Sequence, residues 1–188
     1  MSASYKIEDQ EALHFLTLQV VNWADIFTRI ECRDIILDSF EFCSENKGLE
    51  IYGYVIMSNH IHLLVKSSTG NLSETLRDLK RHTSKQILEF VHSQKESRRD
   101  WLLMIFKYAA RKNNRTNQYQ VWTHENHAEI IYSTKFIEQK LDYIHNNPVS
   151  AGIVQYPEDY LYSSARCYAG IPALFETHRL KIPWKTVR

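Results

Sequence analysis

The chain of 188 residues is 44% hydrophobic and has a formal net charge of +1, which is enough for one well-buried core. No linker rich in Gly, Ser or Pro divides it, so we expect a single domain over residues 1–188 with a core at about 13–168. No apolar run approaches a membrane span, and the polar N-terminus lacks the apolar core of a signal peptide. We therefore expect no membrane contact and a cytoplasmic location, which the three widely spaced cysteines also favour.

Charge is distributed unevenly along the chain. Residues 77–115 hold 11 Lys or Arg against 4 Asp or Glu, whereas the remainder holds 12 against 18. This asymmetry predicts a basic surface for a polyanion, although a solvated helix and loop could carry the same charge without binding anything.

A strand and then a helix are predicted at the start of the chain. Residues 13–21 are rich in β-branched and aromatic side chains, which is typical of a strand. Over residues 31–46 the apolar side chains recur at helical spacing, and Gly48 stands where such a helix would end.

A β-hairpin is predicted next. Residues 49–57 and 60–66 have the composition of two strands, and Ser58 and Asn59 between them are suited to a tight turn. Two histidines would then begin the second arm of the hairpin.

A long helix is predicted after Asn71, which forms a capping-box pattern with Glu74. Its apolar side would be formed by Leu72, Leu76, Leu79, Thr83, Ile87 and Phe90. The candidate nucleic-acid ligands on its other side are Arg77, Lys80, Arg81 and Lys85. We expect these four cations to contact phosphates.

The second half of the chain is less regular. Residues 94–118 are charged and rich in Asn, and we interpret them as an insertion in which residues 101–106 form a short amphipathic helix. A last helix is predicted from about Thr134, and it is expected to finish before Pro148.

Weak strand character at residues 118–122 and 130–132 supplies a further strand. The order strand, helix, strand, strand, helix, strand is that of α+β ferredoxin-like folds, in which a split βαβ antiparallel sheet has helices on one face. The helix that starts near Thr134 is then an extra C-terminal helix.

The hairpin carries a His-x-His pair. In a strand, residues i and i+2 face the same way, so His60 and His62 would leave one open sheet face while Ile61 packs on the other. That geometry suits the binding of one metal ion. For an isolated His-x-His, two histidines on a half-exposed strand are the more frequent explanation.

A second stretch adds a tyrosine and an amide. Tyr143 and Asn147 are four residues apart and so share a helix face. Two imidazoles and an amide oxygen leave a divalent ion open positions for polarising a phosphoryl oxygen, and Mg²⁺ or Mn²⁺ would fit. Tyr143 would need in-line placement because its unperturbed pKa is about 10. Packing alone would explain most tyrosines here, a helix end would explain Asn147, and His145 is expected to make a structural hydrogen bond.

These two stretches resemble those of a known family. His60-Ile61-His62 is similar to the His-hydrophobic-His (HUH) signature of IS200-like single-strand tyrosine transposases and their REP-associated relatives. Residues 142–154 resemble the stretch around the nucleophile of REP-associated tyrosine transposases, and with residues 160–165 the resemblance covers roughly 13–168. In this order and separation, the two motifs are far more specific than either alone.

The resemblance implies a ferredoxin-like catalytic domain that acts on single-stranded or hairpin DNA. It implies a divalent metal held by His60, His62 and an amide residue one turn after Tyr143, a position that Asn147 matches although many members have Gln there. It also implies metal-dependent nicking and strand transfer through a 5′-phosphotyrosine intermediate at Tyr143. Relatives include both monomers and homodimers, and residues 94–118 have no obvious counterpart in shorter members.

Two other functions are compatible with the sequence. A non-catalytic ferredoxin-like nucleic-acid-binding module would stack bases on aromatic side chains and bind without metal. A metal-dependent phosphohydrolase that uses water would cleave without ever becoming linked to its substrate.

Overall fold

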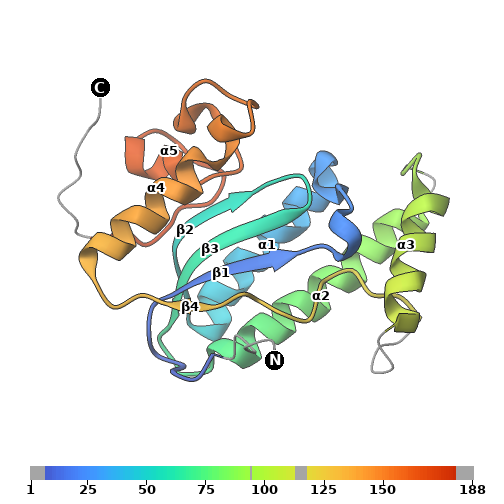
Figure 1. The fold of residues 1–188 in the computed structure, drawn as a ribbon, viewed down its shortest axis with the longest axis horizontal. Helices are drawn as coiled ribbons and strands as arrows, with labels where there is room; N and C mark the ends of the chain where they lie inside the picture. Colours follow the sequence, from blue (N-terminus) through green and yellow to red (C-terminus); the bar gives the residue numbers. More distant parts are fainter. Residues whose placement is uncertain (1–6, 94, 113–117, 181–188) are drawn as a thin grey trace.

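The computed structural model describes residues 7–93, 95–112 and 118–180. It contains a four-stranded antiparallel sheet in the order β2-β3-β1-β4 (Figure 1). The strands are β1 His14–Gln19, β2 Leu49–Ile56, β3 His60–Ser67 and β4 Glu129–Ile130. The helices are α1 Ile30–Lys47, α2 Leu72–His92, α3 Arg99–Lys112, α4 Thr134–Ser150 and α5 Ala165–Ala169. The predicted split βαβ ferredoxin-like fold is confirmed, and none of these described helices is long and apolar enough to cross a membrane.

Alternate residues of the central strands face two separate apolar clusters. Leu16 and Leu18 of β1 belong to a large cluster that also holds the apolar sides of α1 and α2. Phe15 and Leu64 belong to a second cluster with Leu141 of α4. Helices α1 and α2 therefore cover one face of the sheet, and the extra helix α4 packs on the other, beside β2 (Figure 1).

A glycine in β2 allows α4 to approach the sheet closely. A Cβ atom at Gly53 would lie only 2.7 Å from Cδ2 of Leu141, so any larger residue would force the Leu141 side chain to shift. The register of β2 against β3 also shifts between Ile51 and Gly53, as at a β-bulge.

Helix α2 starts differently from the prediction. Helix α1 ends at Gly48 in the left-handed conformation, as expected, but the Asn71 side chain makes no capping hydrogen bond. The backbone N–H of Asn71 instead donates to Ser67 Oγ at 3.1 Å, and that of Ser73 donates to Gln10 Oε1 at 2.8 Å. The capping-box prediction is wrong, because the acceptors come from Ser67, four residues before Asn71, and from Gln10, 63 residues before Ser73.

Helix α4 does not finish before Pro148 but continues to Ser150. Proline removes one helical hydrogen bond, because its ring nitrogen cannot donate to the carbonyl four residues earlier. The Pro148 ring is buried, and its carbonyl accepts from the backbone N–H of Ile153 at 2.9 Å. The burial of the ring and the bond from Ile153 offset the hydrogen bond that proline cannot make. The prediction that the helix finishes before Pro148 is therefore wrong.

The segment before α4 forms less strand than predicted. Helix α3 is longer than the expected residues 101–106, while residues 94 and 113–117 lie outside the described part of the chain. Of the strand expected at 118–122, only an isolated bridge between Trp122 and Val20 is formed. Strand character at 130–132 is reduced to the two residues of β4, because this segment bonds to β1 only at intervals.

The aromatic segment 160–165 covers the β2 edge of the sheet. The backbone N–H of Ile56 donates to the Tyr162 carbonyl at 2.9 Å. Nε2 of His145 lies 2.9 Å from Ser164 Oγ, so the expected structural hydrogen bond of His145 is confirmed. Burial lowers the pKa of His145 to about 4, which keeps the ring neutral near pH 7.

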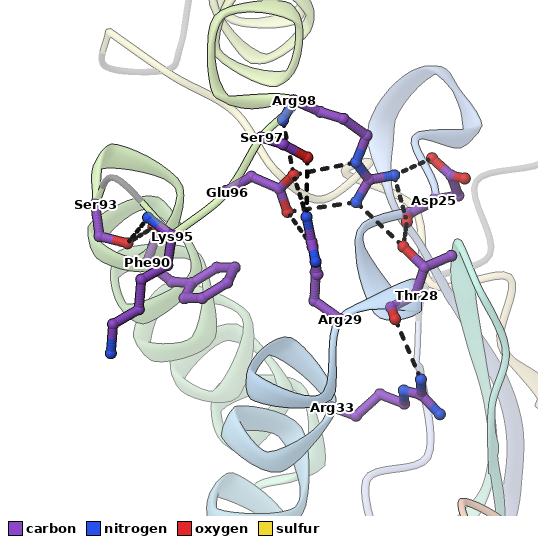
Figure 2. A network of polar contacts seen from close by, with 10 residues as sticks. All are labelled: Asp25, Thr28, Arg29, Arg33, Phe90, Ser93, Lys95, Glu96, Ser97 and Arg98. Atoms are coloured by element: carbon purple, nitrogen blue, oxygen red, sulfur yellow. Dashed lines mark hydrogen bonds and ion pairs between the residues drawn. The ribbon is translucent and has the colours of Figure 1, made fainter.

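A buried carboxylate joins the α2–α3 connection to the loop after β1 (Figure 2). The Glu96 side chain is 1% exposed and accepts hydrogen bonds from Nε of Arg29 at 2.9 Å and Nε of Arg98 at 3.2 Å. Arg98 continues to Asp25 Oδ1 at 3.0 Å. Burial opposes ionisation of Glu96, but the hydrogen bonds from both arginines outweigh it and lower its pKa to about 2.

We expect Glu96→Gln to lower the free energy of unfolding by about 2–3 kcal/mol, because an amide cannot satisfy both guanidinium groups. The loss should be constant above pH 4.5 and shrink as pH falls from 4.5 toward 2, where the wild-type carboxylate becomes protonated. Urea unfolding of both proteins at about pH 6 and about pH 3 measures this difference. An equal loss at the two pH values would contradict the ionised network.

Candidate active site

Both histidines of the His-x-His pair lie on the sheet face that carries α4. The ring centroids of His60 and His62 are 4.7 Å apart, whereas Ile61 is buried in the cluster on the opposite face. The shared face predicted for the two rings is therefore found. Their role as metal ligands stays a prediction.

Each histidine has an oriented ring. Nδ1 of His60 lies 2.7 Å from Asn59 Oδ1, and Nδ1 of His62 lies 2.9 Å from Thr17 Oγ1. Because an amide oxygen only accepts hydrogen bonds, Nδ1 of His60 carries the proton and Nε2 keeps its lone pair. Thr17 can accept from His62 in the same way. Neither Nε2 atom is hydrogen-bonded to any described residue, so both are free to bind a metal ion.

The environment keeps both rings neutral. Burial lowers the pKa of His60, and burial together with the charges of His60 and Lys140 lowers that of His62 to about 3. The neutral ring is the form that binds metal. The expected open strand face is wrong for His62, which is only 5% exposed, because Phe15 stacks on its ring at 5.4 Å.

Helix α4 brings the tyrosine to the histidines. The Tyr143 ring is half-exposed and meets the His62 ring edge-on, with centroids 5.0 Å apart. Asn147 follows one turn later on the same helix and is partly buried. Its side chain makes no hydrogen bond within the described residues. The histidine motif and the tyrosine motif of the same chain therefore meet in one site.

The donor set of this site is nitrogen-rich and small. Across residues 7–93, 95–112 and 118–180, no group of three or more His, Cys, Asp or Glu could hold a metal ion. The ligand set of two imidazoles and the Asn147 amide oxygen stays a prediction. Such a set would suit a divalent ion such as Mn²⁺ and would leave coordination positions open.

The sequence pattern did not identify a cation beside the site. Nζ of Lys140 lies 4.2 Å from the Phe15 ring centroid and 2.8 Å from a carboxylate oxygen of β4. Its spacing of three residues from Tyr143 on one helix was the available signal. Thr17 and Asn59 were also missed, because their contacts depend on strand register and turn geometry.

Three of the four predicted phosphate ligands on α2 are solvent-exposed. The exposed side-chain fractions are 65% for Arg77, 78% for Arg81 and 74% for Lys85. Lys80 differs, because its Nζ donates to the Thr123 carbonyl at 2.7 Å and to Asn126 Oδ1 at 2.8 Å. Burial lowers its pKa to about 8. Lys80 fastens this loop to α2, and its contact with phosphate stays a prediction.

A groove of about 840 Å³ lies between α2 and residues 118–126 and is called the α2 groove here. Arg77, Arg81 and Lys85 line one wall. Residues 118–126 also border β1, since the backbone N–H of Thr123 donates to a β1 carbonyl at 2.9 Å. The groove therefore borders β1 on the side of the sheet that α2 covers, whereas the histidines lie on the opposite face.

The ferredoxin-like sheet, with a His-x-His strand meeting a tyrosine on an added helix, has the arrangement of a transposase-like α+β domain. Residues 14–147 match the family described as "Transposase IS200 like". The chain therefore belongs to the IS200-like transposase family. No curated protein sequence matches it.

Two solved structures are similar to this chain. A REP-associated tyrosine transposase bound to a REP hairpin is 17% identical, with a TM-score of 0.60 and complete coverage of both chains. Its fold is that of the present protein. A candidate transposase from Deinococcus radiodurans R1 is 15% identical, covering 72% of this chain and 90% of its own, with a TM-score of 0.42.

Proposed function

We propose that this protein is a metal-dependent enzyme that nicks and rejoins single-stranded DNA next to a hairpin through a 5′-phosphotyrosine intermediate. The observation that carries the proposal is the contact of the Tyr143 ring with His62, at 5.0 Å between centroids. Membership of the IS200-like transposase family supports strand transfer as the reaction. The solved relative bound to a REP hairpin supports hairpin DNA as the substrate.

The metal would be held by Nε2 of His60, Nε2 of His62 and the amide oxygen of Asn147. When bound, a divalent ion such as Mg²⁺ or Mn²⁺ would polarise a phosphoryl oxygen of the DNA. Asn59 and Thr17 would orient the two rings through Nδ1, and burial, which lowers the pKa of both rings, would keep the Nε2 lone pairs available.

Tyr143 would be the nucleophile. Its oxygen forms a bond to phosphorus while the bond from phosphorus to the 3′ oxygen breaks. The tyrosine proton passes to water, and the departing 3′ oxygen takes up a proton to become a hydroxyl. Because the phosphotyrosine conserves the energy of the phosphodiester bond, a second 3′-hydroxyl can reverse the step without ATP. Lys140, one turn before, would offset the negative charge of the phosphate.

The α2 groove would hold part of the DNA backbone. Its exposed cations lie along one side of a helix, and phosphate contacts by such cations dominate the affinity for nucleic acids. One chain supplies both the histidines and the tyrosine, so the proposal does not require a homodimer.

Replacing Arg81 and Lys85 together by Ala should weaken single-strand binding and make it less dependent on salt. At about 0.7 per phosphate contact, the slope of log affinity against log salt should flatten by roughly 1.4. Fluorescence anisotropy with a hairpin oligonucleotide over a range of salt concentrations measures the slope. The exchanged variant Arg81→Lys with Lys85→Arg keeps both charges and should keep the slope. An unchanged slope in the Ala variant would make this a solvated helix face.

The decisive experiment for the proposed function is incubation with a labelled single-stranded hairpin oligonucleotide and Mn²⁺, followed by a denaturing gel. Label that migrates with the protein is the expected result. Nicked DNA without a protein-linked label would indicate a hydrolase that uses water. Binding without cleavage, unaffected by a chelator, would indicate a non-catalytic module.

A further inference from the structure

The loop after β1 has an unusual backbone conformation beside the candidate site. Asn22 and Trp23 both have positive φ angles, of 52° and 54°, in the short turn Val21–Trp23. Residues with side chains rarely adopt this left-handed region, and two in succession are rarer still. Such strain persists only when the surrounding structure fixes it, and it gathers at functional sites.

The surroundings do fix this loop. The backbone N–H of Val20 donates to the Asn59 carbonyl at 3.0 Å, and that of Phe27 donates to the Ser58 carbonyl at 2.9 Å. Both acceptors belong to the turn that leads into His60. The buried Glu96 network holds the far end of the loop through Arg98 (Figure 2). The strained residues and the first histidine are therefore parts of one rigid unit.

The strained turn displays a large aromatic ring to solvent. Trp23 is 59% exposed, so it contributes little to the core for a ring of its size. Its ring stands nearly perpendicular to that of His60, with centroids 6.1 Å apart. Exposed aromatic rings beside a polyanion-binding site are the means by which proteins hold single-stranded bases.

We propose that Trp23 is a stacking platform for a DNA base adjacent to the scissile phosphate. The inference rests on the proposed function for the identity of the strand. A phosphate held between His60 and Tyr143 would leave a neighbouring nucleotide within reach of the Trp23 ring. Every base has a π face, so this contact would add affinity and position the strand without selecting its sequence.

Binding assays test the platform without relying on catalysis. The probe is a hairpin oligonucleotide with a single-stranded 5′ dT flank, and all variants carry Tyr143→Phe so that no covalent adduct forms. Trp23→Ala should weaken binding roughly tenfold to a hundredfold, whereas Trp23→Phe should keep most of the affinity. Phe42→Ala is the matched control, because Phe42 is 56% exposed on α1 at the opposite sheet face, and it should bind as the parent does.

Melting temperatures separate stacking from packing. Glycine accepts a positive φ angle without strain, so Trp23→Gly should melt at or above the temperature of Trp23→Ala, and neither should melt far below the parent. Both should lose DNA affinity to a similar extent. A ring needed for packing would instead lower the melting temperature in both variants. If the variants then regained full DNA affinity at temperatures well below their melting temperatures, the proposal would be overturned.

Photo-crosslinking shows where the bases lie. 5-Iododeoxyuridine placed in the flank of the same probe should crosslink to the peptide that holds Trp23, as mapped by mass spectrometry. Crosslinks confined to other peptides, or full affinity in Trp23→Ala, would overturn the platform. A wild-type protein that crosslinks at Trp23 but forms no phosphotyrosine would overturn the nicking function and leave the platform standing. If the wild type formed the phosphotyrosine adduct and Trp23→Ala did not weaken DNA binding, only the platform would be overturned.

Discussion

Tyr143→Phe is expected to abolish nicking and covalent attachment while hairpin binding and Mn²⁺ affinity remain. The substitution removes only the hydroxyl, which the proposed reaction uses as its nucleophile, so the cleavage rate should fall by at least about a thousandfold. A denaturing gel with labelled hairpin DNA and Mn²⁺ measures both nicks and adducts.

The structure predicts that this variant stays folded. The Tyr143 ring packs edge-on against Phe15 and His62, and phenylalanine preserves these contacts. The hydroxyl makes no hydrogen bond within the described part of the chain. The free energy of unfolding should therefore change by no more than about 0.5 kcal/mol.

The matched control is Tyr156→Phe, at an exposed tyrosine of the same half of the chain. It should cleave as the wild type does. If Tyr143→Phe still produced nicks at a comparable rate, water would be the nucleophile. Mass mapping of the wild-type adduct is a stricter check, because further hydroxyls are present at Tyr132, Tyr160 and Tyr162. Attachment at any of them would show that Tyr143 is not the nucleophile.

Local sequence patterns were sufficient to predict most of the sheet. Residues 49–57 and 60–66 have the side-chain period of two that is typical of strands, and the polar turn between them predicts a hairpin. Gly48 marked the end of α1 because a left-handed residue was needed there. These signals succeeded because each depends on neighbours in the chain.

Features that depend on distant residues were missed or wrong. Asn71 was predicted to cap α2, yet Gln10, 63 residues before Ser73, supplies an acceptor at the start of that helix. Helical spacing placed Lys80 on the polar side of α2 but could not indicate that Asn126 would bind its ammonium group. The loop that contains Asn126 follows α3, so no short-range pattern could have placed it.

In the candidate site, too, local patterns were predicted correctly and tertiary contacts were not. The period of two in a strand placed His60 and His62 on one face, and the spacing of four placed Asn147 one turn after Tyr143. The burial of His62 depends on contacts with Phe15 of another strand and Tyr143 of α4. Sequence therefore predicted which residues could meet, and the tertiary structure determined how buried they are.

His60→Ala combined with His62→Ala is expected to abolish cleavage and the stabilisation of the protein by Mn²⁺. An ion that binds only the native state stabilises it by about 2.7 kcal/mol at a concentration one hundredfold above Kd. For a chain of this size, that corresponds to a rise of roughly 5–10 °C in melting temperature. The double variant should show no such rise.

Without Mn²⁺, the double variant should also be less stable than the wild type. His62 is buried, stacks on Phe15 and bonds to Thr17, so its loss should cost about 2 kcal/mol. His60→Ala alone removes a more exposed ring and should cost less, while still losing most of the Mn²⁺ effect. The informative quantity is therefore the gain on adding Mn²⁺, not the melting temperature itself.

His124→Ala is the control for adventitious binding, because His124 is exposed on the wall of the α2 groove and not among the proposed ligands. It should gain as much stability from Mn²⁺ as the wild type. An equal gain in the His60 and His62 double variant would remove both histidines from the metal site. A gain lost in the double variant and kept in His124→Ala would instead place the ion on β3, beside the tyrosine that the proposed reaction requires.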